Sequence, residues 1–94
     1  EQVTVGPEAS SMFQTGIRAY VAGKLEEALK AFEWAVSAND TFTQAFVWAG
    51  RTSLELGESE LAVTYWSEVL ELDPGDTRAN YFLEVAQTQV EFGA

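Results

Sequence analysis

The chain has 94 residues, of which 47% are hydrophobic and 13% aromatic, and only two are proline. This content suits one small domain with a modest core and argues against intrinsic disorder beyond the first few residues. The sequence contains no cysteine and no histidine, which excludes disulfides, thiolate nucleophiles, the usual zinc ligands and histidine acid–base chemistry.

Fifteen acidic residues against five basic ones give a formal net charge of -10. The field of such a chain repels phosphate backbones and anionic lipid surfaces, so we expect no nucleic-acid partner. No apolar run reaches the roughly 18 residues of a membrane span, and we expect no direct membrane span. The sequence begins at Glu1, as a processed protein or an excised segment would, and so leaves the compartment undetermined between cytoplasm and cell envelope.

The predicted elements begin with an extended lead-in over residues 1–8, in which two valines alternate with polar residues before Pro7. Apolar residues then recur every three or four positions from Glu8 to Val21, which is the period of a helix that buries one face. Gly23 ends this segment. The same period predicts a second helix from Leu25 to Ala38.

A third helix is predicted from about Phe42 to Leu56, with Asp40 and Thr41 as caps and Gly57 as its end. Its partner is expected from Leu61 to Leu72.

The segment Asp73-Pro74-Gly75-Asp76 is predicted to turn, because proline disfavours a helical residue before it and glycine is conformationally free. Asp76 then caps a fifth helix, expected from about Thr77 to Phe92.

Two parts of the sequence match each other at a separation of 34 residues. The matching pairs are Gly16 and Gly50, Gly23 and Gly57, Ala28 and Ala62, Phe32 and Trp66, and Ala35 and Val69. A helix–turn–helix unit at this period resembles the tetratricopeptide repeat. The resemblance implies an all-α, right-handed α-α superhelix, a TPR solenoid, with repeats over residues 9–42 and 43–76 and a C-terminal capping helix over 77–94.

The small residues of each repeat are expected to let its two helices approach closely, while Phe32 and Trp66 fill the space between adjacent repeats. Two positions depart from the family pattern. Thr15 stands where the family has a large aliphatic residue, and Asp40 stands where it has proline. At both we expect local adjustment without a change of fold.

In the proteins that this chain resembles, the first helix of each pair lines a concave groove that holds a peptide or a partner helix. The matching positions are Phe13, Ile17, Tyr20, Val47, Trp48, Arg51, Arg78, Phe82 and Val85. One subfamily grips the carboxylates of chaperone tails with Lys, Asn, Asn, Lys and Arg. Here those positions hold Phe13, Ile17, Trp48, Arg78 and Phe82, of which only Arg78 fits. The resemblance therefore implies an apolar groove, suited to an amphipathic helix or a hydrophobic segment, and no chaperone-tail clamp.

A second interpretation of these residues stays open, because aromatic stripes at helical spacing are usually core. Phe13, Ile17 and Phe82 would then pack against each other, or against Val3 and Val5 folded into the groove. We interpret Trp48 as a contact residue.

Trp34 falls where the family has a solvent-facing polar residue, as Glu68 does in the next repeat. It is either a second contact with a partner or a ring folded over a neighbouring side chain.

No group of residues indicates catalysis or metal binding, so we expect no enzyme, no cofactor and no metal. Glutamate pairs such as Glu26-Glu27 lie on predicted outer faces without an apolar pocket, and they supply too few ligands for a divalent ion. The resemblance implies a non-enzymatic adaptor or scaffold that binds a protein or peptide partner. The alternative is self-association, either as a homo-oligomer or as a packing module of a larger assembly.

Overall fold

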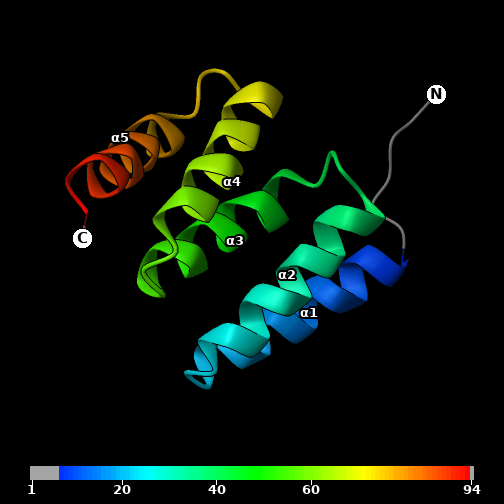
Figure 1. The fold of residues 1–94 in the computed structure, drawn as a ribbon. Coiled ribbons are helices and arrows are strands. Elements are labelled where there is room, and N and C mark those ends of the chain that lie inside the picture. Colours follow the sequence, from blue (N-terminus) through cyan, green and yellow to red (C-terminus); the bar gives the residue numbers. More distant parts are fainter. Residues whose placement is uncertain (1–6, 94) are drawn as a thin grey trace.

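The computed structural model describes residues 7–93, which form five α-helices joined by short turns and contain no strand. The helices are α1 (Pro7–Val21), α2 (Leu25–Ala38), α3 (Thr43–Glu55), α4 (Ser59–Leu72) and α5 (Thr77–Phe92). They follow one another across the molecule in chain order, with α1 and α2 at one end and α5 at the other (Figure 1). The all-α class predicted from the sequence is confirmed.

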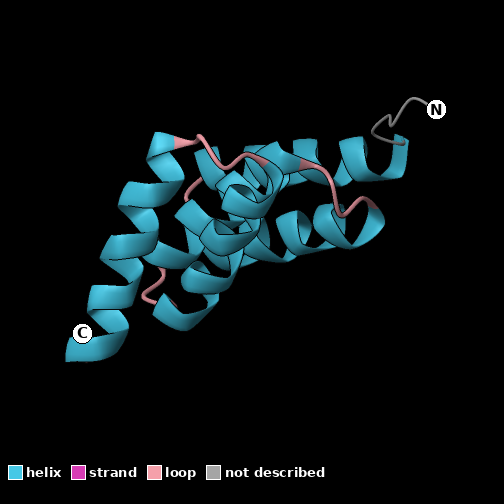
Figure 2. Cartoon of the chain, turned by 90° about the horizontal axis from the view of Figure 1, so that it is seen from above, coloured by secondary structure: helices cyan, strands magenta, loops and turns pink. Residues whose placement is uncertain are grey.

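Each helix packs on the next one in the sequence, from α1 on α2 through to α4 on α5. Viewed from above, the connecting loops are short and lie at the ends of the helices (Figure 2). A chain stacked in this way buries its core between successive helices and has no single centre, which is the layout of a solenoid.

The predicted helix boundaries hold within two residues, and α3 (Thr43–Glu55) is one residue shorter at each end than predicted. Helices α2 and α5 lie where the sequence placed them. Helix α1 begins at Pro7, so the last two residues of the predicted lead-in are helical, and residues 1–6 lie outside the described part. Helix α4 begins at Ser59, two residues before Leu61, because apolar periodicity cannot detect a first turn made of polar residues.

The core depends on two contacts in which an aromatic ring lies directly on a glycine. A Cβ atom added to Gly16 would lie 2.5 Å from Cε1 of Phe32, and one added to Gly50 would lie 2.7 Å from Nε1 of Trp66. Both rings are fully buried. The close approach of the two helices in each repeat, expected from their small residues, is therefore confirmed.

The same two rings also reach into the following repeat. The Phe32 and Trp48 ring centroids lie 6.2 Å apart, and Trp66 stacks on Phe82 of α5 at 5.0 Å. Phe32 and Trp66 thus fill the space between repeats as predicted.

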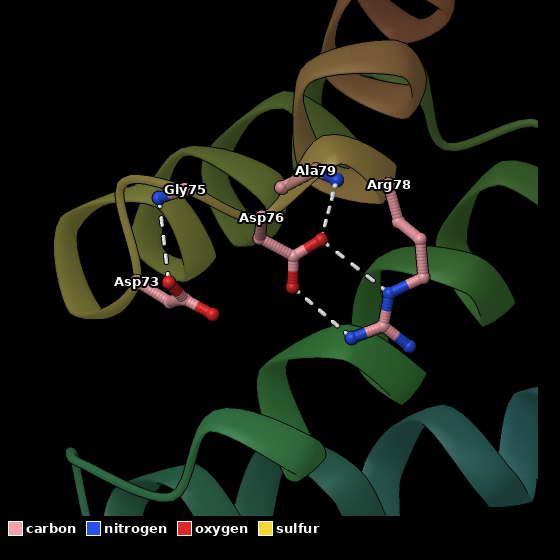
Figure 3. Close-up of polar contacts among 5 residues, drawn as sticks. All are labelled: Asp73, Gly75, Asp76, Arg78 and Ala79. Atoms are coloured by element: carbon pink, nitrogen blue, oxygen red, sulfur yellow. Dashed lines mark hydrogen bonds and ion pairs between the residues drawn. The ribbon is translucent and has the colours of Figure 1, made fainter.

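The turns after α2 and α4 have the same hydrogen-bond pattern, although only the second contains proline. The Oδ1 atom of Asn39 accepts a hydrogen bond from the backbone N–H of Thr41 at 3.0 Å, and Oδ1 of Asp73 accepts one from Gly75 at 3.3 Å. Figure 3 shows the second of these. The polar side chain that opens each turn holds it, so Asp40 in the proline position leaves the fold unchanged.

Thr15, the other departure from the family pattern, is also accommodated locally. Its side chain is exposed, and its hydroxyl donates to the backbone oxygen of Ser11 at 3.0 Å within α1.

Helix α5 has the predicted cap. The Oδ1 atom of Asp76 accepts a hydrogen bond from the backbone N–H of Ala79 at 3.1 Å, and its carboxylate also pairs with Arg78 (Figure 3). These bonds satisfy one free N–H of the first turn and place negative charge at the positive end of the helix dipole.

The predicted cap of α3 by Asp40 and Thr41 is wrong. The N-cap residue is Phe42, which has no side-chain cap hydrogen bond. The Thr41 hydroxyl donates instead to Asn39, and the Phe42 ring lies 5.0 Å from that of Phe13. Aromatic packing on α1 therefore sits where a polar cap was expected.

The helices at the two ends of the stack, α1 and α5, carry exposed polar residues at repeat positions whose equivalents on α3 are largely buried. On α5, Asn80, Glu84 and Gln87 are exposed, whereas Phe46, Gly50 and Ser53, 34 residues earlier, are buried. On α1, Ser11, Gln14 and Arg18 are exposed, whereas Ala45 and Thr52 on α3 are buried and Trp48 is partly buried. Helix α5 thus has the polar outer surface that a capping helix needs, and α1 has the same character at the other end, but the capping role of α5 stays a prediction.

Gly50→Leu is expected to lower the free energy of unfolding by at least about 3 kcal/mol, since even one added carbon would collide with the buried Trp66 ring. Thermal melting followed by circular dichroism measures this. Gly75→Ala is the control, because its Cβ would meet only Oδ1 of Asp73, at 3.8 Å. A Gly50→Leu protein that melts cooperatively at the wild-type temperature would show that the repeat register is wrong.

Asp76→Ala is expected to cost about 1 kcal/mol at neutral pH through loss of the cap. The hydrogen bond from Arg78 lowers the pKa of Asp76 below its ordinary value of 3.8. The charged carboxylate therefore stabilises the folded state above pH 3.8, and this contribution is lost as the pH falls through the lower pKa of the folded state.

Urea denaturation of wild type and Asp76→Ala across this pH range tests the cap. The gap in stability should be constant near neutral pH and should narrow in acid. Asp40→Ala removes an exposed carboxylate that caps nothing, so it should change stability by less than about 0.5 kcal/mol. Equal losses from the two substitutions would contradict the assignment of Asp76 as the cap.

Candidate functional site

The predicted groove residues come from α1, α3 and α5, and we call the surface at these positions the inner face. It comprises Phe13, Ile17, Tyr20, Val47, Trp48, Arg51, Arg78, Phe82 and Val85. Val47 is only 2% exposed and belongs to the core, so its side chain is not available to a partner. The two arginines are exposed, and the other six side chains are partly buried.

The aromatic residues of the inner face pack against the core and also retain some exposed surface. Trp48 lies between Tyr20, edge-on at 5.1 Å between ring centroids, and Phe32 at 6.2 Å. Phe13 contacts the rings of Phe32 and Phe42, at 5.8 and 5.0 Å. Packing with the core and exposure to solvent, which the sequence left as alternatives, are thus both present at the same residues.

Tyr20, Trp48, Arg51 and Glu55 form a cluster where α1 meets α3. The Arg51 guanidinium lies over the Trp48 ring, with Cζ 4.6 Å from the ring centroid. The Tyr20 hydroxyl donates a hydrogen bond to the carboxylate of Glu55. This hydrogen bond, followed by burial, raises the pKa of Tyr20, and the nearby charge of Arg51 opposes the rise. The cluster therefore ties the two helices together by a polar contact and an aromatic contact.

Arg78 lies on the same face but is already paired. Its Nη2 atom lies 3.0 Å from Oδ2 of Asp76, whose side chain is only 7% exposed. The hydrogen bonds that the Arg78 guanidinium donates to the Asp76 carboxylate are the main reason that the pKa of Arg78 is raised. This guanidinium is committed to the cap of its own helix.

Two residues that the sequence prediction did not include belong beside the inner face. Tyr81 is 62% exposed and packs edge-on against Phe82 at 5.1 Å. The 34-residue period places it in line with Phe13 and Val47, so the repeat could have identified it. Glu55 is recognised only through its contact with Tyr20, which lies 35 positions away and leaves no local sequence signal.

Trp34 is 62% exposed on α2, and Glu68 is its counterpart in the next repeat. The larger part of the ring is in solvent, which favours the interpretation as a contact residue over a ring folded onto a neighbour.

The rest of the described chain offers little that could serve as a chemical site. Residues 7–93 contain no group of His, Cys, Asp or Glu side chains placed to hold a metal ion, and no helix among them is long and apolar enough to cross a membrane. An open cavity of about 290 Å³ lies between the α3–α4 turn and the end of α5, lined by Gly57, Glu58, Ser59, Glu60, Gln89, Val90 and Gly93. It involves none of the inner-face residues.

Comparison with known proteins supports the fold through structure alone. No protein-family model and no curated protein matches the sequence. Among solved structures, this chain is similar to the first TPR of Spaghetti (RPAP3) bound to the HSP90 peptide SRMEEVD, with a TM-score of 0.60. The two share 18% sequence identity, over 94% of this chain and 99% of that one. The five helices, the repeat contacts and this likeness agree, and the chain has the all-α solenoid fold of a tetratricopeptide repeat domain.

Proposed function

We propose that this chain is a non-enzymatic interaction module whose inner face binds a peptide or an amphipathic helix of a partner protein. The observation that carries the proposal is Trp48, a large aromatic residue that keeps solvent-exposed surface while Tyr20 and Phe32 hold its ring in place. Residues of this kind, rigid and only partly covered, supply most of the binding energy in protein interfaces.

The surroundings of Trp48 favour an apolar ligand surface. Phe13, Ile17, Phe82 and Val85 are all partly buried, so each can cover an apolar side chain of a ligand at little cost in conformational entropy. An amphipathic helix or a hydrophobic segment offers such side chains along one side.

The similar structure suggests a peptide ligand, but this chain calls for a different kind of peptide. In that structure the TPR domain is bound to a peptide with the sequence SRMEEVD. Here four of the five clamp positions carry Phe13, Ile17, Trp48 and Phe82, none of which has the charged or amide group that a carboxylate clamp uses. We therefore propose recognition through apolar contacts, without a chaperone-tail clamp.

Self-association is the second candidate, and one observation favours it. Trp34 is largely exposed on α2, outside the inner face, so the chain has a second apolar contact point. End-to-end stacking of one copy on another would be a polar contact, because it would bring Glu84 and Gln87 of one copy against polar residues such as Arg18 of the next. Self-association through Trp34 would instead use the side of the stack.

Trp48→Ala is expected to weaken peptide binding by about 2 kcal/mol or more, roughly thirtyfold, because it removes the central aromatic contact. The probe is a fluorescein-labelled peptide selected by the wild-type protein from a random 12-residue display library, and fluorescence anisotropy measures the affinity. Trp34→Ala is the matched control, since it removes the same side chain from α2. Circular dichroism checks that helicity is retained.

Trp48→Phe keeps a ring between Tyr20 and Phe32, so it tests the same residue if the alanine variant is poorly folded. It is expected to bind less tightly than wild type and more tightly than Trp48→Ala. Unchanged affinity in both Trp48 variants would remove this residue from the site. A library that yields no binder to the wild-type protein would contradict the proposed function itself.

Molar mass by light scattering, measured across a wide dilution series, separates the two candidates. We expect the mass of a single chain at all concentrations, which leaves the inner face open for a partner. A mass that rises reversibly with concentration would favour self-association, and Trp34→Ala would then test the part played by α2.

A further inference from the structure

Within residues 7–93, Arg51 has no salt bridge to an acidic residue, although the chain is rich in acidic residues. Fifteen of the 94 residues are Asp or Glu, yet the one ion pair within residues 7–93 joins Arg78 to Asp76. The Arg51 side chain is exposed, and its guanidinium rests over the Trp48 ring at 4.6 Å.

The nearest acid along the helix is engaged elsewhere. Glu55 follows Arg51 by four residues, a spacing at which Arg and Glu side chains commonly pair on a helix surface. Its carboxylate instead accepts the hydrogen bond from Tyr20 on α1. Tyr20 thereby keeps Glu55 at the α1–α3 contact, and Trp48 keeps Arg51 on the inner face.

A guanidinium that contacts an aromatic ring through its carbon still has N–H donors for a further partner. These donors match the two oxygens of a carboxylate. The nine residues of the inner face include two arginines and no acid, and Arg78 is already neutralised by Asp76. The charge that remains to be complemented on this face is therefore that of Arg51.

We infer that Arg51 binds a carboxylate of the partner segment, so that the inner face selects peptides in which an acidic residue stands beside apolar ones. This inference rests on the proposed function and adds the chemistry of the ligand. Arg51 does not occupy any of the five clamp positions, so the expected ligand carries one carboxylate at an internal side chain and needs no charged C-terminus.

The size of the expected effect follows from two opposing facts. A charge-assisted hydrogen bond to a guanidinium strengthens binding, but the pair is exposed and Glu55 lowers the local positive potential. Replacing the acidic residue of the peptide by its amide should therefore weaken binding by about fivefold.

The test uses the random 12-residue display library with three proteins: wild type, Arg51→Gln and Arg18→Gln. Arg18→Gln is the matched control, because it removes the same charge from an exposed position in the last turn of α1. Wild type and Arg18→Gln should enrich peptides with Asp or Glu next to apolar residues, and Arg51→Gln should lose this preference. Anisotropy with one selected peptide and its Glu→Gln analogue should show about fivefold discrimination by wild type and none by Arg51→Gln.

The outcomes separate this inference from the proposed function. Selected peptides that depend on Trp48 but show no acidic preference would overturn the role of Arg51 and leave the proposed function standing. A preference that persists in Arg51→Gln would overturn it as well. The absence of any binder to the wild-type protein would overturn both. Thermal melts of the three proteins confirm that the comparison is made between folded chains.

Discussion

The contact on which this structure depends is the placement of an aromatic ring on a glycine, Phe32 on Gly16 and Trp66 on Gly50. Glycine lets the two helices of a repeat approach until a fully buried ring fills the space between them. Burial of this ring removes a large apolar area from water. The contact of Trp66 with Gly50 depends on close packing and not on hydrogen bonding. The Nε1 atom of Trp66 faces Gly50, and within the described residues it is a buried polar atom without a hydrogen-bond partner. Its loss of hydration opposes folding, and close packing of the ring offsets that cost.

The same two rings also support the candidate site. Trp48 packs on Phe32, and Phe82 stacks on Trp66, so both of these inner-face rings contact a ring that lies on a glycine. The packing within the repeats thus also fixes the rings of the binding surface, and no additional contacts are needed to hold them. Since residues 7–93 contain two such contacts, the inner face is small, and the partly exposed rings at its centre matter more than the extent of the face.

The sequence predicted the fold well because the repeat is defined by the recurrence of small and large residues at fixed positions. Glycine and an aromatic ring at matching positions determine helix pairing, and the helices follow from their apolar period. The start of α3 was predicted wrongly, because polar residues before a helix suggest a cap whereas Phe42 packs on Phe13. At the candidate site, exposure could be inferred only from the repeat register, which failed for the buried Val47. The Tyr20–Glu55 contact was not predictable, because the two residues are 35 positions apart in the sequence and no local sequence pattern indicates such a pair.

The polar residues at both ends of the stack limit where this fold can make contacts. On α3, in the middle of the stack, Ala45 and Thr52 are buried. Their counterparts on α1, Ser11 and Arg18, are exposed to solvent. Any surface that covers this end must supply hydrogen-bond or charge partners to these groups, since polar groups buried without partners are costly. Apart from single exposed side chains such as Val21 and Phe92 at helix ends, the accessible apolar surfaces are the inner face on one set of helices and Trp34 on another. Of these two surfaces, the inner face alone combines fixed rings with an arginine, Arg51, that forms no salt bridge within residues 7–93. For that reason we place specificity there and treat Trp34 as an independent contact.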